Sequence, residues 1–152
     1  MFPDPTVRWQ PYPSVMDGIR GIFILDRGTH TGTRRLVMTP MTESLPVFVV
    51  ELDCAIFLTV EELLYDMAVP EHGGWNDGVE TYIREASQSR LLEIYDRLNA
   101  MQRPPVRHFC FPGLEYAVEC LASAEPVIHE FPDYDTAFAW VRMREDGDRA
   151  VH

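Results

Sequence analysis

The chain contains no lysine among its 152 residues, so all 13 of its basic side chains are arginines. Its 24 acidic residues leave a formal net charge of −11. A charge of this sign repels the phosphate backbone of nucleic acids and anionic lipid headgroups, which argues against generic binding to either. A P-loop nucleotide site is also excluded, because that motif requires a lysine, and no G-x-G-x-x-G motif is present.

Cysteine is scarce as well. The chain has three, Cys54, Cys110 and Cys120, and no C-x-x-C pair. An odd, widely spaced set argues against a disulfide framework and a structural zinc site, and free thiols fit a reducing compartment. The five histidines are scattered, without an H-x-x-x-H or H-E-x-x-H pattern, so the sequence predicts neither a metal nor a cofactor.

Long apolar runs are also missing. No stretch approaches the roughly 20 consecutive apolar residues that span a bilayer. The first residues, Met-Phe-Pro-Asp-Pro, have neither the basic region nor the apolar region of a signal peptide. We therefore expect a cytoplasmic protein that does not associate with membranes.

The most informative feature that the chain does contain is a stretch of one charge sign. Between Leu36 and Ile83 there are nine carboxylates and no basic side chain. They are Glu43, Glu51, Asp53, Glu61, Glu62, Asp66, Glu71, Asp77 and Glu80. If side chains that are close in sequence are also close in the fold, these form an acidic face that attracts a basic protein.

The second half of this stretch also carries groups suited to protein recognition. Gly73 and Gly74 permit the close approach of a partner's backbone, and Trp75 offers the flat amphipathic surface common at interface hot spots. The candidate partner-binding residues are Glu61, Glu62, Asp66, Glu71, His72, Trp75, Asn76, Asp77 and Glu80. In the alternative, Trp75 packs on the core and Asn76 or Asp77 caps the following helix.

The length and an apolar content of 46% fit one domain with a single core. Residues 1–14 hold four prolines and are expected to form an extended arm. Residues 21–26 and 34–39 are expected to form an antiparallel hairpin, with a helix that begins near Thr33 as the alternative for the second segment. Residues 47–50 are expected to form a strand buried on both faces. Residues 55–58 either extend that strand or begin a helix, since periodicity does not decide between the two.

Four helices are expected from apolar spacing, capping residues and proline stops. A Thr-x-x-Glu capping pattern opens the first, at residues 59–67. The second and longest covers residues 79–101, and the third covers residues 114–122. The last helix follows Asp133 or Asp135, either of which can cap it.

Two strands are expected beside these helices, at residues 106–111 and 126–131. With the helix between them they would make a β-α-β unit whose strands are parallel. Residues 145–152 are expected to be a frayed, charged tail. The predicted fold is one mixed α/β domain with a sheet of four to five strands, packed by three to four helices. Its N-terminal hairpin would be antiparallel and its C-terminal part a β-α-β-α unit.

Two segments near the C-terminus resemble a known family. Val127-Ile-His-Glu-Phe131 followed by Asp135-Thr-Ala-Phe-Ala-Trp-Val141 looks like the closing strand and helix of STAS-like domains. The resemblance covers less than half of the chain, and the first 75 residues do not match it. It implies an α/β regulatory domain that binds a ligand or a protein partner, and it identifies no functional residue.

The candidates for catalysis are Cys110 and His108. They are two residues apart on an expected strand, where alternate side chains share a face. Cys110 also precedes an expected helix, whose N-terminus would favour a thiolate. Same-face neighbours on a strand are about 6–7 Å apart, too far for a direct sulfur–nitrogen hydrogen bond. Core packing is therefore the alternative role.

Three functions remain open from the sequence. The first, which we favour, is a non-enzymatic binding or regulatory domain that offers an acidic face to a basic protein. The second is a small cysteine-dependent enzyme, or a STAS-like domain that binds a ligand or partner. The third is a structural module that forms a homodimer through an exposed strand edge near residues 36–39.

Overall fold

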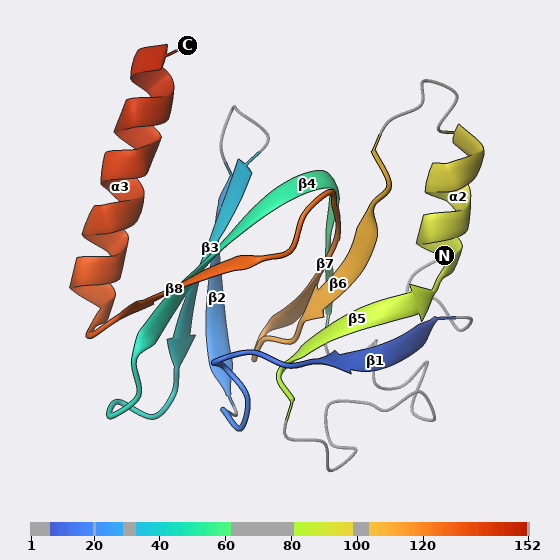
Figure 1. Ribbon diagram of the computed structural model, residues 1–152. Helices are drawn as coiled ribbons and strands as arrows, with labels where there is room; N and C mark the ends of the chain where they lie inside the picture. Colours follow the sequence, from blue (N-terminus) through green and yellow to red (C-terminus); the bar gives the residue numbers. More distant parts are fainter. Residues whose placement is uncertain (1–6, 20, 29–32, 62–80, 99–103, 152) are drawn as a thin grey trace.

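The computed structural model describes residues 7–19, 21–28, 33–61, 81–98 and 104–151 (Figure 1). In these ranges the chain forms eight strands and two helices. The strands are β1 (Arg8–Tyr12), β2 (Ile22–Gly28), β3 (Thr33–Pro40), β4 (Val47–Glu61), β5 (Ile83–Gln88), β6 (Arg107–Phe111), β7 (Tyr116–Ala122) and β8 (Val127–Phe131). The helices are α2 (Arg90–Leu98) and α3 (Tyr134–Val151).

The described strands belong to one sheet, and each neighbouring pair among them is antiparallel. Their order is β1-β5-β6-β7-β4-β3-β2, and β8 pairs with the first part of β4. The long strand β4 serves both halves of the sheet, because residues 47–51 pair with β8 whereas residues 54–61 pair with β7. β7 and β8 therefore follow the same side of β4, one after the other.

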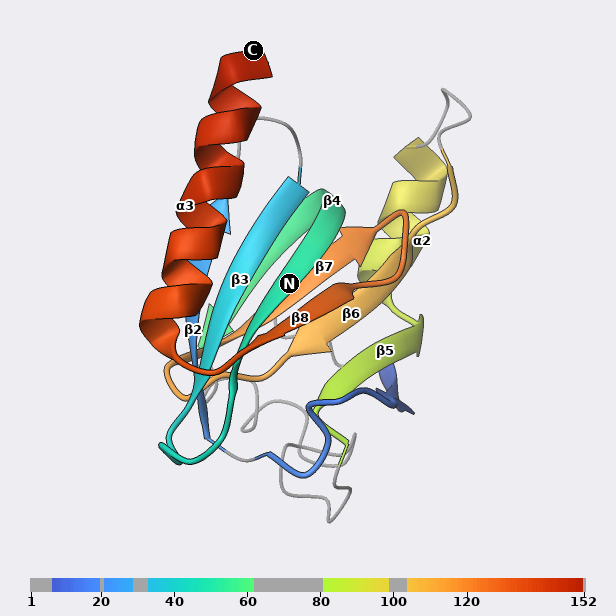
Figure 2. The same cartoon turned by 60° about the vertical axis from the view of Figure 1, so that its left-hand side comes forward.

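The sheet bends at β4 into two layers that enclose the main core (Figure 1). We call them the β3 layer (β2, β3, β8 and residues 47–51) and the β6 layer (β1, β5, β6, β7 and residues 54–61). Their inner faces share one apolar cluster, which includes Phe48 from the first layer and Phe109 and Val118 from the second. Figure 2 shows α3 outside the β3 layer and α2 outside the β6 layer.

Each helix is held by one apolar face. α3 buries Ala137 and Val141 against Val37 and Val49 of the β3 layer. α2 packs Leu91 and Tyr95 on the outer face of the β6 layer. Full burial of an aliphatic or aromatic side chain contributes about 1.5–3 kcal/mol, so a few such contacts suffice to dock a short helix.

A β-bulge in β4 lets this strand line the core in both layers. The ladder with β7 is regular except between Cys54 and Ile56, where Ala55 has no partner. Leu52 and Cys54 pack on the inner cluster before the bulge, and Phe57 does so after it. The extra residue therefore reverses the alternation of faces and keeps apolar side chains on the inner face.

The free edge of β2 is covered by the turn between β6 and β7. The Leu114 N–H donates to the Ile22 carbonyl oxygen at 2.9 Å. The Tyr116 hydroxyl donates to the Ile24 carbonyl oxygen at 2.7 Å. Gly113 permits this approach, because a Cβ at that position would lie 2.9 Å from Ile24 Cδ1.

The predicted fold class is wrong. The sheet has eight strands, all antiparallel where described, in place of four to five in a mixed sheet, and the described ranges hold two helices in place of three to four. The main error lies at residues 114–122, where Tyr116–Ala122 forms β7 and not a helix. Both faces of this strand are buried, and a short apolar run of that kind does not distinguish a buried strand from a helix.

The predicted parallel β-α-β unit is also wrong, because its expected helix is strand β7. Residues 107–111 and 127–131 do form β6 and β8, but these strands do not pair with each other. β6 lies between β5 and β7, and β8 lies beside β4. Because β7 replaces the expected helix, the structure gives no support to the STAS-like resemblance.

Two further helix predictions fail in their described parts. Residues 59–61 are the end of β4, and residues 62–67 lie outside the described ranges. Within the segment expected as the longest helix, Ile83–Gln88 is β5 and helix begins only at Arg90. It begins there because Ser89 caps it, with Ser89 Oγ accepting the Leu92 N–H at 3.1 Å.

Several local predictions are confirmed. β2 and β3 form the antiparallel hairpin, and residues 47–50 are buried in β4. Asp133 caps α3, since its Oδ1 accepts the Thr136 N–H at 2.8 Å. Residues 8–12 of the proline-rich arm are extended and form β1. The frayed tail expected at residues 145–152 is not found in its described part, because α3 continues through Val151. None of the helices in the described ranges is long and apolar enough to cross a membrane.

Candidate functional site

β6 carries both catalytic candidates on the outer face of its layer. His108 lies opposite Leu121 of β7, which packs beneath α2. Cys110 shares this face, because it is two residues further along the strand. Across the sheet, Cys110 pairs with Arg84 of β5 on one side and with Glu119 of β7 on the other. The structure thus places the two candidates among buried polar side chains from three strands.

His108 is the centre of a chain of hydrogen bonds that joins three elements. Its Nδ1 lies 2.8 Å from Oγ of Ser89 at the start of α2, and its Nε2 lies 2.8 Å from Oε1 of Glu119. The ring of Trp9 on β1 meets the imidazole edge-on, with the ring centroids 5.0 Å apart. His108 is 0% exposed, and Ser89 and Glu119 are each 1% exposed, so the network is closed to solvent.

One arrangement of hydrogens satisfies every contact in this network. In it, Ser89 Oγ accepts the Leu92 N–H and donates its own hydrogen to Nδ1 of His108. The imidazole in this arrangement carries its hydrogen on Nε2 and donates it to Glu119. With this assignment the network ties the N-terminus of α2 to β6 and β7.

Serine, histidine and a carboxylate in one chain are also the groups of a hydrolase triad. In such an enzyme the serine oxygen must reach a substrate carbonyl, and the histidine takes up its proton. Here Ser89 is buried and its oxygen serves as the helix cap. This geometry favours a structural role for His108, which is the packing alternative.

The thiol of Cys110 is equally unsuited to catalysis. Burial raises its pKa well above the ordinary value of 9.0, and the nearby charge of Glu119 raises it further, although Arg84 opposes this. A buried thiol that stays protonated is a poor nucleophile towards an external substrate. The helix expected after Cys110 is β7, so no helix N-terminus stabilises a thiolate there.

Ser89 and Glu119 were missed because each becomes informative only through a distant partner. Ser89 does have a sequence signal, since a serine directly before an amphipathic segment is a common N-cap. Glu119 stands alone within an apolar run, which indicates a buried carboxylate that needs a partner. The identity of that partner, His108, depends on the pairing of β6 with β7.

A second polar network fastens α3 to the β3 layer. Arg27 on β2 forms a two-pronged ion pair with Glu145, in which both nitrogen–oxygen distances are 2.8 Å. Arg35 on β3 is only 5% exposed and binds Glu51 at 2.9 Å and Asp148 at 3.0 Å. Because Glu145 and Asp148 are three residues apart, they share a face of the helix.

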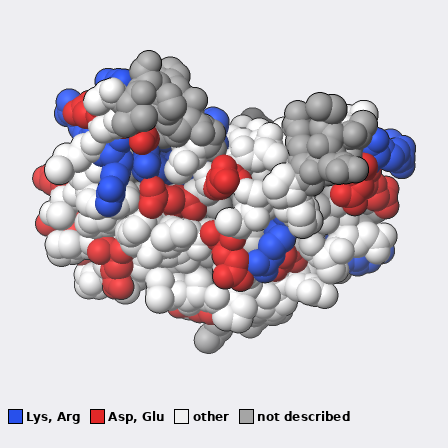
Figure 3. Space-filling view, turned by 45° about the horizontal axis from the view of Figure 1, so that its top comes forward, with Lys and Arg blue, Asp and Glu red and all other residues white. Residues whose placement is uncertain are grey.

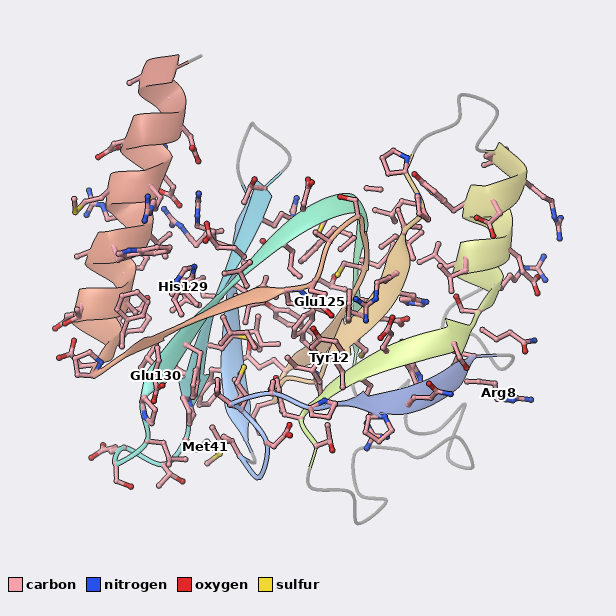
Figure 4. The ribbon with its side chains drawn as sticks, viewed as in Figure 1. Arg8, Tyr12, Met41, Glu125, His129 and Glu130 are labelled. Carbon is pink, nitrogen blue, oxygen red and sulfur yellow. The ribbon has the colours of Figure 1, made fainter. Side chains whose placement is uncertain are left out.

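Glu51 joins this network to β8. It accepts a hydrogen bond of 2.7 Å from Nε2 of His129, whose ring lies 4.6 Å from that of Trp140 on α3 (Figure 4). Burial would raise the pKa of Glu51, but hydrogen bonds from His129 and Arg35 outweigh it, and the pKa is lowered. The carboxylate is therefore held in its charged form.

A third cluster surrounds Arg107 in the β6 layer. Its guanidinium binds both carboxylate oxygens of Glu85 at 2.7 Å, and Nη1 lies 3.0 Å from Glu125. Glu125 is also hydrogen-bonded to the Tyr12 hydroxyl (Figure 4). Burial, followed by the charge of Glu125, raises the pKa of Tyr12. Arg107 is thus fully engaged by carboxylates of its own chain.

Most of the predicted partner-binding residues lie outside the described part of the chain. They are Glu62, Asp66, Glu71, His72, Trp75, Asn76, Asp77 and Glu80, while Glu61 is described only as the last residue of β4. The described carboxylates of the same stretch do not converge. Glu43 precedes β4 and Glu61 ends it, so a strand of 15 residues separates them. Glu51, near the middle, is paired with Arg35 and hydrogen-bonded to His129.

Comparisons with known proteins add no functional information. No family model, no curated protein and no solved structure matches the chain. Within the described residues, no group of three or more His, Cys, Asp or Glu side chains is arranged to hold a metal ion. Support for a function therefore comes from the chain's own residues.

Proposed function

We propose that the protein is a non-enzymatic binding domain that recognises a basic protein through its surplus of carboxylates. The observation that carries this proposal is the way in which the fold uses its guanidinium groups. Arg27, Arg34, Arg35 and Arg107 are each paired with one or two carboxylates of the chain. These four arginines therefore do not offset negative charge elsewhere on the surface.

The remainder of the chain is strongly acidic. The carboxylates in these pairs are Asp26, Glu51, Glu85, Glu125, Glu145 and Asp148. Taking four arginines from 13 and six carboxylates from 24 leaves nine arginines against eighteen carboxylates. On the face in Figure 3, arginines lie beside acidic groups, and other acidic groups have no arginine next to them. Such a surplus steers a cationic partner towards the molecule.

We place the recognition surface at residues 61–80. This segment holds six carboxylates and no arginine, and it also contains Trp75 between polar residues. Aromatic side chains supply the binding energy that exposed charges alone do not, because surface ion pairs contribute only about 0–1 kcal/mol each. Charge would thus set the rate and the choice of partner, and Trp75 would contribute affinity.

The alternatives have less support. A cysteine-dependent enzyme would need an accessible thiolate, whereas Cys110 is buried and its pKa is raised. A homodimer through residues 36–39 would need an exposed edge, but β3 is paired on both sides, with β2 and β4. That edge prediction is wrong.

A pull-down with a matched charge control tests the proposal. The test variant combines Glu71→Gln, Asp77→Asn and Glu80→Gln. The control combines Glu93→Gln, Asp96→Asn and Glu115→Gln, which remove the same charge from exposed positions. We expect a basic protein to be captured by the wild type and the control, and lost with the test variant.

Salt provides the second arm of this experiment. The captured protein should be released at about 0.5 M salt, where the screening length is only a few ångströms. An unchanged set of captured proteins with the test variant would refute the proposal. Equal loss with both variants would also refute it, because net charge alone would then explain the binding.

A further inference from the structure

We infer that Cys54 and Cys120 form a redox-sensitive thiol pair, which hydrogen peroxide converts into a reversible disulfide between β4 and β7. The pair lies where β4 passes from the β3 layer to the β6 layer. A disulfide there would fix the bend of the sheet. This inference does not depend on the proposed binding function.

The two thiols lie on the same face of neighbouring strands. Cys54 is opposite Ala122 in the ladder, and Cys120 is opposite Phe57. Cys120 belongs to the inner apolar cluster, and both Cys54 and Phe57 pack against that cluster. In this register the two side chains are diagonal neighbours across the ladder, and a hydrogen bond with Cys54 is the largest cause of the raised pKa of Cys120.

The bulge at Ala55 is what brings the thiols together. Without the extra residue, the alternation of faces would place Cys54 and Phe57 on opposite sides of β4. The bulge also leaves Ala55 outside the regular ladder. A disulfide requires the two Cβ atoms to approach to about 3.8 Å, and an irregular ladder accommodates that adjustment more readily than a regular one.

The two thiols differ in exposure, which suits them to sequential roles. Cys120 is 0% exposed, whereas Cys54 is partly exposed at the rim of the core. The hydrogen bond with Cys54, together with burial, raises the pKa of Cys120 well above 9.0. A small oxidant therefore reaches Cys54 first, and Cys120 is the resolving thiol beside it.

The chemistry balances with hydrogen peroxide as the oxidant. The Cys54 thiolate attacks one peroxide oxygen, the O–O bond breaks, and water leaves after protonation, which gives Cys54 sulfenic acid. The sulfur of Cys120 then attacks the sulfenic sulfur while the Cys120 thiol proton passes to the departing hydroxyl group, which leaves as a second water. Overall, two thiols lose two electrons and two protons, and one peroxide is reduced to two waters.

Cys110 provides an internal control. It lies on the outer face of the β6 layer, opposite to the face that carries Cys120, because residues 109 and 110 alternate along β6. Its neighbours across the ladder are Arg84 and Glu119, not a thiol. Cys110 should therefore remain reduced while the other two thiols are oxidised.

Peptide mapping of the native chain tests this inference. The protein is treated with hydrogen peroxide, its free thiols are alkylated, and it is digested without reduction for mass spectrometry. We expect a cross-linked peptide that contains Cys54 and Cys120, a mass loss of two hydrogen atoms, and full reversal by dithiothreitol. The Cys110→Ala variant should give the same cross-link.

The contrary outcomes are equally definite. Cys54 recovered as sulfinic acid with Cys120 alkylated would overturn the inference, and so would a cross-link that involves Cys110. Recovery of all three thiols in reduced form would overturn it as well. Because these readouts use the wild-type chain, they do not depend on whether a cysteine variant folds.

Discussion

Replacing Ser89 with alanine tests the role of the buried network around His108. The change removes the oxygen that caps α2 by accepting the Leu92 N–H, and it removes the hydroxyl that donates to His108 Nδ1. Loss of a serine N-cap costs about 1 kcal/mol. A buried ring nitrogen left without a partner adds about 1–3 kcal/mol.

We therefore expect Ser89→Ala to lower the free energy of unfolding by about 2–4 kcal/mol. For a chain of this size the melting temperature should fall by about 5–15 °C. Urea unfolding, followed by tryptophan fluorescence and circular dichroism, measures the difference. The midpoint should shift without a change in slope, because the surface exposed on unfolding is nearly the same.

Ser87→Ala is the matched control. Ser87 is exposed, and its hydroxyl makes only a 3.4 Å hydrogen bond to the Arg8 carbonyl oxygen. A substitution at such a site changes stability by less than about 0.5 kcal/mol. If Ser89→Ala unfolds at the same urea concentration as Ser87→Ala, the network contributes no stability. The structural role assigned to His108 would then be wrong.

Two further predictions concern the docking of α3 and the ion network around Glu51. Val141→Ala should lower the free energy of unfolding in urea by about 2 kcal/mol, because Val141 is 0% exposed against the β3 layer. Met143→Ala is the control and should be nearly neutral, because Met143 is 74% exposed. Equal effects of the two substitutions would contradict the docking of this helix. The pKa of Glu51 lies below its ordinary value of 4.5, so its contribution to stability is present above that pH and is lost as the pH falls through the folded-state pKa. Glu51→Gln should flatten the loss of stability in acid, and parallel curves for the variant and the wild type would count against the ion network.

The strands with strong local signals could be predicted from the sequence, whereas β7 could not. Within β7, the polar Glu119 among apolar neighbours resembles the polar face of a short helix. In the structure Glu119 is buried on the outer face of the β6 layer, where its Oε1 lies 2.8 Å from Nε2 of His108, which is 11 residues away in sequence but on the next strand. A buried carboxylate is tolerated only with such a partner, and the partner is fixed by strand pairing.

The functional candidates could not be predicted fully either, because closeness in sequence and closeness in the fold differ. Carboxylates that are close in sequence need not be close in space when the chain between them is extended. A strand rises about 3.3 Å per residue, so β4 alone separates Glu43 from Glu61 by tens of ångströms along the chain. Conversely, Cys54 and Cys120 are distant in sequence but adjacent in the fold, and a single bulged residue decides that they share a face.

The contact between Tyr116 and β2 has a consequence for the behaviour of the protein at high concentration. β2 is an edge strand, and the unpaired backbone groups of an edge strand can bind strands of other molecules, with fibre growth as the extreme case. Here the Tyr116 hydroxyl and the Leu114 N–H donate hydrogen bonds to two carbonyl oxygens on the open side of β2. At the opposite end of the sheet, Pro11 on β1 has no N–H to donate. We therefore expect Tyr116, at the start of β7, to protect this edge against aggregation in addition to the overall charge.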